Sequence, residues 1–366
     1  MPVTKLKSVE MNSSETYISD RSKLLNRYGL GMLLMPQDVA VTNPWFMVFE
    51  PQLDALVDQV GKGLMRFCFS ADHRVQAYAI HDEQAIVLAA GMFDLLCKLT
   101  ASMVSSGLYP AVGASSLAAW EPDIKNNLLS VRGSLEEGTF NWSDGPSWAR
   151  DPDRLELFFQ ILRTMVRFVV LHETGHLWHR HGERHRQGHR IEVDSNSPNR
   201  LPQEKALESQ ARELLADQFA FRLLIQGQHG ENQGVFANPS ADNLRCTLLR
   251  SPRDEIAFYL LVVYFYFYAV DRLDWSVGDA HLYSHPPAPF RLKALIADLF
   301  EFGALGVQQE ECKSVISDAC LVANAAVATT FRRFPDMNWM ESMADPHLYE
   351  HFTNLCREIP KWRRAE

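Results

Sequence analysis

The chain has 366 residues, of which 46% are hydrophobic and 22% charged, and its net charge at pH 7 is −9. This composition is typical of a folded globular protein with a sizeable core, and the length allows one or two domains. The negative net charge argues against a broad nucleic-acid interface. Six cysteines without a CxxC pair, and an N-terminus without the apolar core of a signal peptide, predict reduced thiols in a cytoplasmic protein.

The first elements along the chain are a lead-in and a small β-rich region. Residues 1–22 are polar and mixed in charge, which predicts a flexible lead-in. Residues 75–96 contain two short β-rich runs around a polar turn at residues 81–84, followed by Gly91 and an apolar helix. We expect an exposed strand edge there, able to bind an extended chain through main-chain hydrogen bonds.

Residues 101–153 carry several loop signals and three tryptophans, Trp120, Trp142 and Trp148. Two interpretations remain open for this long irregular stretch. It forms either a lid or recognition insert, or a variable excursion on the surface.

An apolar helix is predicted over residues 155–171, and it leads directly into His172-Glu173-Thr174-Gly175-His176. Positions i and i+4 share one face of a helix, so His172 and His176 can bind the same ion. Glu173 lies about 100° around the helix axis, where it can face a water molecule rather than the ion. This HExxH pattern predicts a zinc site on a buried helix.

Zinc in a catalytic site usually takes three protein ligands, and a second amphipathic helix over residues 208–225 offers the third. Glu213 and Asp217 lie at i and i+4 on one face of it. We expect Glu213 to bind the metal and Asp217 to accept the ring N–H of a ligating histidine. Glu208 is a rival ligand, and a solvent-exposed acidic face is the simpler alternative. The intervening residues 179–202, although rich in histidine and arginine, are predicted to be a solvated connector.

Residues 256–270 form an unbroken apolar and aromatic run of fifteen residues with four tyrosines. As a helix this run is about 22 Å long, shorter than a hydrocarbon layer of about 30 Å. A core helix behind the metal site is therefore favoured over a membrane segment, which remains the alternative and would make the protein membrane-associated.

A proline-rich turn then presents His285 and leads into a helix that carries Arg291. Both side chains are suitable donors to an oxyanion, whereas the simpler alternative is a surface connector. Residues from about 308 to 366 are predicted to be helical and carry no recognisable chemistry.

Taken together, the motifs resemble the gluzincin peptidases that include the HtpX-like heat-shock proteases and the CAAX prenyl proteases. That family carries HExxH, then E-x-x-A-D-x-x-A, then H-P-x-x-x-x-R, and here these appear at His172 to His176, Glu213 to Ala220 and His285 to Arg291. His181 matches a common HExxHxxxxH extension. The resemblance covers residues 65–100 and 155–300.

The resemblance implies an α+β, predominantly helical fold: a zincin-like catalytic domain with a small edge sheet and two zinc-ligand helices. We expect this domain over residues 23–305, after the lead-in of residues 1–22 and before a helical extension over residues 306–366. An insert interrupts it at about residues 101–153.

The expected activity is zinc-dependent hydrolysis of peptide bonds in a protein or peptide substrate, with one zinc ion per chain on His172, His176 and Glu213. Glu173 acts as the general base, and His285 with Arg291 stabilises the oxyanion. Asp217 orients a ligating histidine.

Two other interpretations compete with a general endopeptidase. One is a regulatory or phage-exclusion-type metalloprotease that cleaves one specific partner protein, since residues 213–220 also resemble the ligand helix of ImmA/IrrE-type proteases. The other is a catalytically silent, metal-stabilised interaction protein.

Overall fold

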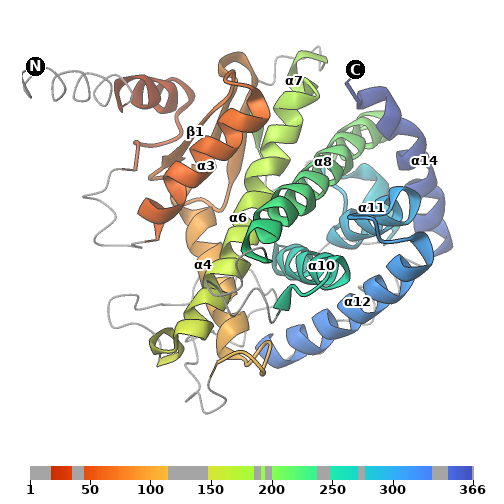
Figure 1. Cartoon of the computed structure of the whole chain (residues 1–366). Coiled ribbons are helices and arrows are strands. Elements are labelled where there is room, and N and C mark those ends of the chain that lie inside the picture. The colour runs from red at the N-terminus through yellow and green to blue at the C-terminus, as the bar shows by residue number, and fades with distance from the viewer. Residues whose placement is uncertain are drawn as a thin grey trace, which may run out of the picture.

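The computed structural model describes residues 18–34, 45–113, 147–184, 191–193, 200–236, 248–270, 277–331 and 345–364. Within them the protein is predominantly helical with one small sheet, so the predicted α+β class is confirmed at that level. The first 17 residues and most of the predicted insert over residues 101–153 lie outside the described residues. In Figure 1 the sheet lies on one side of the molecule, and the long helices fill the rest.

The sheet has four strands in the order β1-β3-β2-β4. Strands β2 (Ala77–Ile80) and β3 (Ala85–Ala89) form an antiparallel hairpin, and β1 (Arg66–Ser70) pairs parallel to β3. The hairpin turn is the one-turn helix His81–Glu83, which ends with Gln84 in the left-handed conformation at φ 47°. The two β-rich runs and the polar turn predicted from the sequence are therefore confirmed.

The connector between the two metal-site helices contains more structure than the sequence predicted. It holds a short helix, α7 (His181–Arg184), and a strand, β4 (Ile191–Val193). This strand pairs antiparallel with β2, so the strand edge expected to be exposed is covered from Tyr78 to Ile80. A three-residue strand gives almost no periodicity of its own, and its pairing depends on a partner far away in the chain.

Two long helices cross the middle of the protein side by side: α6 (Pro152–Trp178) and α8 (Gln203–Phe236). The first begins at Asp151, whose side chain accepts the backbone N–H groups of Asp153 and Arg154, and Pro152 takes the first helical position. The two helices approach closely at Gly175, where a Cβ atom would lie 3.2 Å from the Cα atom of Ala216. A larger residue there would push the helices apart beside the HExxH segment.

The remaining helices surround this pair. Helix α10 (Pro252–Val270) is buried over most of its length, so the predicted core helix is confirmed and begins four residues earlier than the apolar run. The main core cluster also takes in α3 (Phe46–Gly61), α4 (Ala90–Ser105), part of α11 (Ala288–Phe302) and α12 (Gln309–Phe331). A separate cluster joins α8 and α11 to the C-terminal α14 (Pro346–Trp362).

Among the described helices, α12 is the one long and apolar enough to cross a membrane by length and composition, and 44% of its most apolar window is buried inside the protein. Helix α10 is instead enclosed by other helices. All the cysteines in the described residues are free thiols.

Candidate metal centre

His172 and His176 on α6 and Glu213 on α8 meet at one point, and all three are buried. The two Nε2 atoms lie 3.1 Å apart. The Glu213 carboxylate lies 3.3 Å from Nε2 of His172 and 3.5 Å from Nε2 of His176. One ligand atom from each residue lies within 4.8 Å of the other two, so the cluster can hold a metal ion.

A hydrogen bond behind the ring sets the direction of His172. Its Nδ1 lies 2.9 Å from Oδ1 of Asp217, and because a carboxylate oxygen can only accept, the ring Nδ1–H donates this bond. The Nδ1–H tautomer leaves the Nε2 lone pair directed at the common point of the cluster. The Nε2 lone pairs of His172 and His176 repel each other at 3.1 Å unless a proton or a cation lies between them. Nitrogen atoms arranged in this way can act as the donors of a metal site.

Asp217 is in turn held by Arg291 on α11, and both side chains are buried. Two parallel bonds join them, from Nε to Oδ2 at 2.8 Å and from Nη2 to Oδ1 at 2.7 Å. The guanidinium also lies over the ring of Phe267, with its central carbon 4.6 Å from the ring centre. The expected role of Asp217 fits this geometry. Arg291 was expected to help stabilise an oxyanion, but its guanidinium is bonded to Asp217 instead.

His176 is oriented by another histidine, which the sequence marked only as a motif extension. Nδ1 of His181 lies 2.9 Å from Nδ1 of His176, and His181 is fully buried. The chain turns sharply to allow this, because Arg180 takes the left-handed conformation at φ 56° between α6 and α7. The five-residue spacing was the signal in the sequence, although it gave no indication of the role.

Glu173 is buried beside the cluster and lines a cavity of about 10 Å³ together with His172, Glu213 and Ala77 of β2. That volume is close to what a single water molecule needs. A carboxylate, a water-sized space and the ligand side chains thus lie next to one another. Glu208, the rival ligand, is half-buried and outside the cluster, because five residues turn it about 140° away from Glu213.

His285 also lies close to the cluster, with Nε2 3.7 Å from Oε1 of Glu213. It is the more open member, with 27% of its side chain exposed, and its Nδ1 is bonded to Ser284 Oγ at 3.0 Å. The turn before it is tied to α8 by Gln210, whose amide donates to the carbonyls of Ala280 and Tyr283. His285 is therefore a neighbour of Glu213 that is partly open to solvent.

The charges of the centre favour a cation at its middle. Burial alone lowers the pKa of His172, but the carboxylates of Asp217 and Glu213 outweigh it and raise that pKa to about 10. Burial raises the pKa of Glu213, and the three histidines around it pull that pKa well below its usual value. Burial likewise raises the pKa of Asp217, which Arg291 and His172 bring below normal. A metal ion placed there would replace protons on the imidazoles.

No family model matches the chain, and neither a curated protein nor a solved structure matches it.

Proposed function

We propose that the chain is a zinc-dependent endopeptidase of the gluzincin type, with a zincin-like catalytic domain and one zinc ion per chain. The proposal rests mainly on one observation: two histidines four residues apart on α6 converge with Glu213 of α8, and Glu173 adjoins the same water-sized cavity. Two imidazole nitrogens and one carboxylate, with space for a fourth group, are the donor set of catalytic zinc. Its proposed substrate is a protein or peptide.

When bound, zinc supplies a Lewis acid that polarises a carbonyl group and acidifies water. Side chains of the protein then transfer the proton, stabilise the oxyanion and hold the ligands. Glu173 accepts a proton from the attacking water and passes it to the leaving amine. His285, at the open side of the cluster, donates a hydrogen bond to the oxyanion. Asp217 and His181 hold the two imidazoles in place, and Arg291 holds Asp217.

The test combines metal analysis with a peptide-library assay on the purified full chain, with and without the chelator 1,10-phenanthroline. We expect about one zinc ion per chain and cleavage that the chelator abolishes. Replacing Glu173→Gln keeps the shape of the side chain and removes the base, so cleavage should fall by roughly 100-fold or more while the zinc content stays unchanged.

Glu208→Gln, the same exchange on a half-buried glutamate outside the cluster, is the matched control and should cleave like the wild type. Undiminished turnover by Glu173→Gln would contradict the base role. A protein that binds zinc but cleaves no peptide would instead be the metal-stabilised interaction protein.

A further inference from the structure

The ring of His181, which lies against His176, is itself enclosed by two other rings. It is fully buried, although it lies at the start of α7, just after the chain leaves α6. The ring of His179 stacks on it, with ring centres 5.6 Å apart and planes 19° from parallel. The ring of Trp362 meets it at 87°, with ring centres 6.3 Å apart. One stacked neighbour and one perpendicular neighbour thus limit how the His181 ring can turn.

The backbone beside His181 is fixed as well, because Gly182 packs directly on the ring of His81. A Cβ atom at Gly182 would lie 2.4 Å from Cγ and Cδ2 of that ring, much closer than real side chains approach. His81 is buried and belongs to the one-turn helix of the β2–β3 hairpin. The hairpin therefore holds the start of α7, and a larger residue at position 182 would push α7 away from it.

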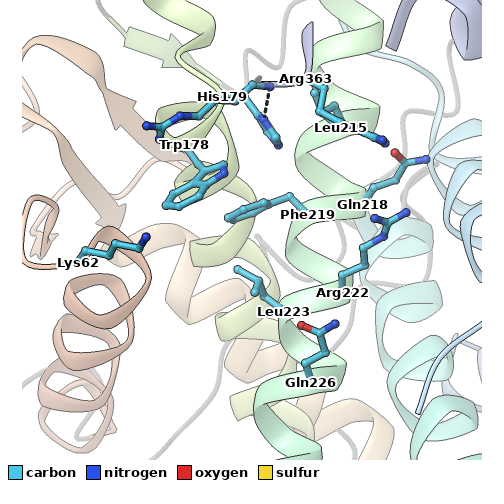
Figure 2. Close-up of a pocket in the computed structure, with 11 residues that line it drawn as sticks. Lys62, Trp178, His179, Leu215, Gln218, Phe219, Arg222, Leu223, Gln226 and Arg363 are labelled. Atoms are coloured by element: carbon cyan, nitrogen blue, oxygen red, sulfur yellow. Dashed lines mark hydrogen bonds between the residues drawn. The ribbon is translucent and has the colours of Figure 1, made fainter. Parts of the chain in front are cut away.

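His179 is held in turn by the segment that follows α14. The backbone N–H of Arg364 donates to Nδ1 of His179 at 3.2 Å, the bond drawn as a dashed line in Figure 2. The guanidinium carbon of Arg364 also lies 5.0 Å from the ring centre of Trp178, the last residue of α6. Arg364 thus contacts both the end of α6 and the histidine that follows it.

Trp362, the last residue of α14, is held by α8 and by its own helix. The guanidinium carbon of Arg212, the residue before Glu213, lies 5.2 Å from the centre of the indole ring. The indole N–H donates to Oε1 of Glu358, one turn earlier on α14, at 3.3 Å. Trp362 also packs against the apolar cluster that joins α14 to α8. The ring that meets His181 is therefore fixed by both helices.

From these contacts we propose that Trp362 and His179 are positioning residues of the metal centre, which act on His176 through His181. With both rings in place, Nδ1 of His181 stays 2.9 Å from Nδ1 of His176, and Nε2 of His176 stays directed at the common point of the cluster. Loss of either ring allows the His181 ring to turn, and the bond to His176 is then broken for part of the time. This inference rests on the metal centre of the proposed function and extends it to α14.

Competition with a coloured chelator on the purified full chain measures the zinc affinity of each variant. Trp362→Leu keeps apolar bulk and removes the flat ring, so zinc affinity should fall about tenfold, the lower end of the effect of outer partners. Trp362→Phe keeps a ring against His181 and should recover most of that loss. His179→Leu and His179→Phe form a second pair with the same expected order, so the test does not depend on the folding of one variant.

Phe352→Leu is the matched control for a purely structural effect. Phe352 lies on the same helix as Trp362, is buried, and also has a cation at its ring, with Nζ of Lys293 4.8 Å from the ring centre. Its ring packs on Phe290 of α11. Phe352→Leu should therefore lower the stability to urea and leave the zinc affinity at the wild-type value.

The visible spectrum of the cobalt(II)-loaded chain gives a second readout, because its d–d bands depend on the geometry of the ligands. We expect these bands to shift in Trp362→Leu and to stay unchanged in Phe352→Leu. Unchanged zinc affinity in both Trp362→Leu and His179→Leu, or an equal loss in Phe352→Leu, would overturn the inference and leave the proposed function intact. A wild type that binds no zinc would overturn both.

Discussion

At the scale of single residues, each histidine of the candidate metal centre is fixed by a partner on the far side of its ring. Asp217 holds His172 and His181 holds His176, each at 2.9 Å. Such partners fix the tautomer and the aim of the ring, so the ligand atoms converge before a metal arrives. The affinity of this candidate metal centre for an ion would therefore depend also on Asp217 and His181, which hold the two rings from behind.

The first prediction concerns the choice of carboxylate ligand. Glu213→Gln removes the negative ligand, and we expect its zinc affinity to fall by more than the roughly 100-fold known for outer partners. Competition with a coloured chelator measures the affinity. Glu208→Gln, on the same helix but outside the cluster, should bind zinc like the wild type. Equal affinity in both variants would contradict the assignment of Glu213.

His181 gives a sharper prediction, because the sequence alone did not assign it a role. His181→Phe keeps a ring in the buried position and removes the bond to His176, so zinc affinity should fall roughly 10–100-fold. His181→Gln restores a hydrogen-bonding group and should recover part of that loss. If His181→Phe and His181→Gln both bind zinc as tightly as the wild type, His181 has only a packing role.

Among the elements, α8 connects the metal centre to the turn that carries His285. Gln210 donates two hydrogen bonds to that turn, at Ala280 and Tyr283, and accepts one from Nε2 of His351 on α14 at 2.8 Å. The amide uses its donors and its acceptor at once, so it specifies which ring nitrogen of His351 carries the proton. The C-terminal helix thereby supports the position of the turn.

That connection predicts a dependence of stability on pH. Burial, and then the nearby His281, lower the pKa of His351 from 6.5 to about 4. The folded protein therefore binds fewer protons at this site than the unfolded chain, and the stability it contributes is lost as the pH falls from about 6.5 toward 4. His351→Gln keeps a donor to Gln210 without titrating, so its free energy of unfolding should fall less over that interval.

Urea unfolding at a series of pH values measures the effect. The groups of the candidate metal centre are the same in the wild type and in His351→Gln, so their pH dependence cancels in the comparison. His73→Gln, which replaces an exposed histidine, is the control and should follow the wild type. The link through Gln210 is contradicted if His351→Gln loses as much stability as the wild type between pH 6.5 and 4.

The elements also show which parts of the fold and of the site could be predicted from sequence patterns. Helices α6, α8 and α10 were predicted because long apolar periodicity is local, and the HExxH spacing placed His172 and His176 on one face. Strand β4, the bond from His181 to His176 and the contact of Arg291 with Asp217 were missed. Each of them depends on a turn angle or on a partner distant in sequence, which local periodicity does not encode.

At the scale of the whole molecule, the protein is organised around α6 and α8, which carry the candidate metal ligands on one side. On the other side they line a cavity of about 560 Å³, whose wall includes Lys62, Arg222, Arg363 and Arg364. The predicted C-terminal extension is part of this arrangement. Helix α14 packs on α8 in a shared apolar cluster, and Arg363 and Arg364 line the cavity. No motif in residues 306–366 indicated this, because a cavity wall of separate side chains leaves no pattern in any one segment.

The most direct test of the central claim is the zinc K-edge X-ray absorption spectrum of the purified full chain. We predict a first coordination shell of two nitrogen scatterers from imidazole and one or two oxygen scatterers, at about 2.0–2.2 Å. The Glu213→Gln variant should show an altered shell or no bound zinc. A shell with sulfur ligands, or a spectrum that is identical in the wild type and in a His172→Ala, His176→Ala double variant, would contradict a metal centre at the junction of α6 and α8.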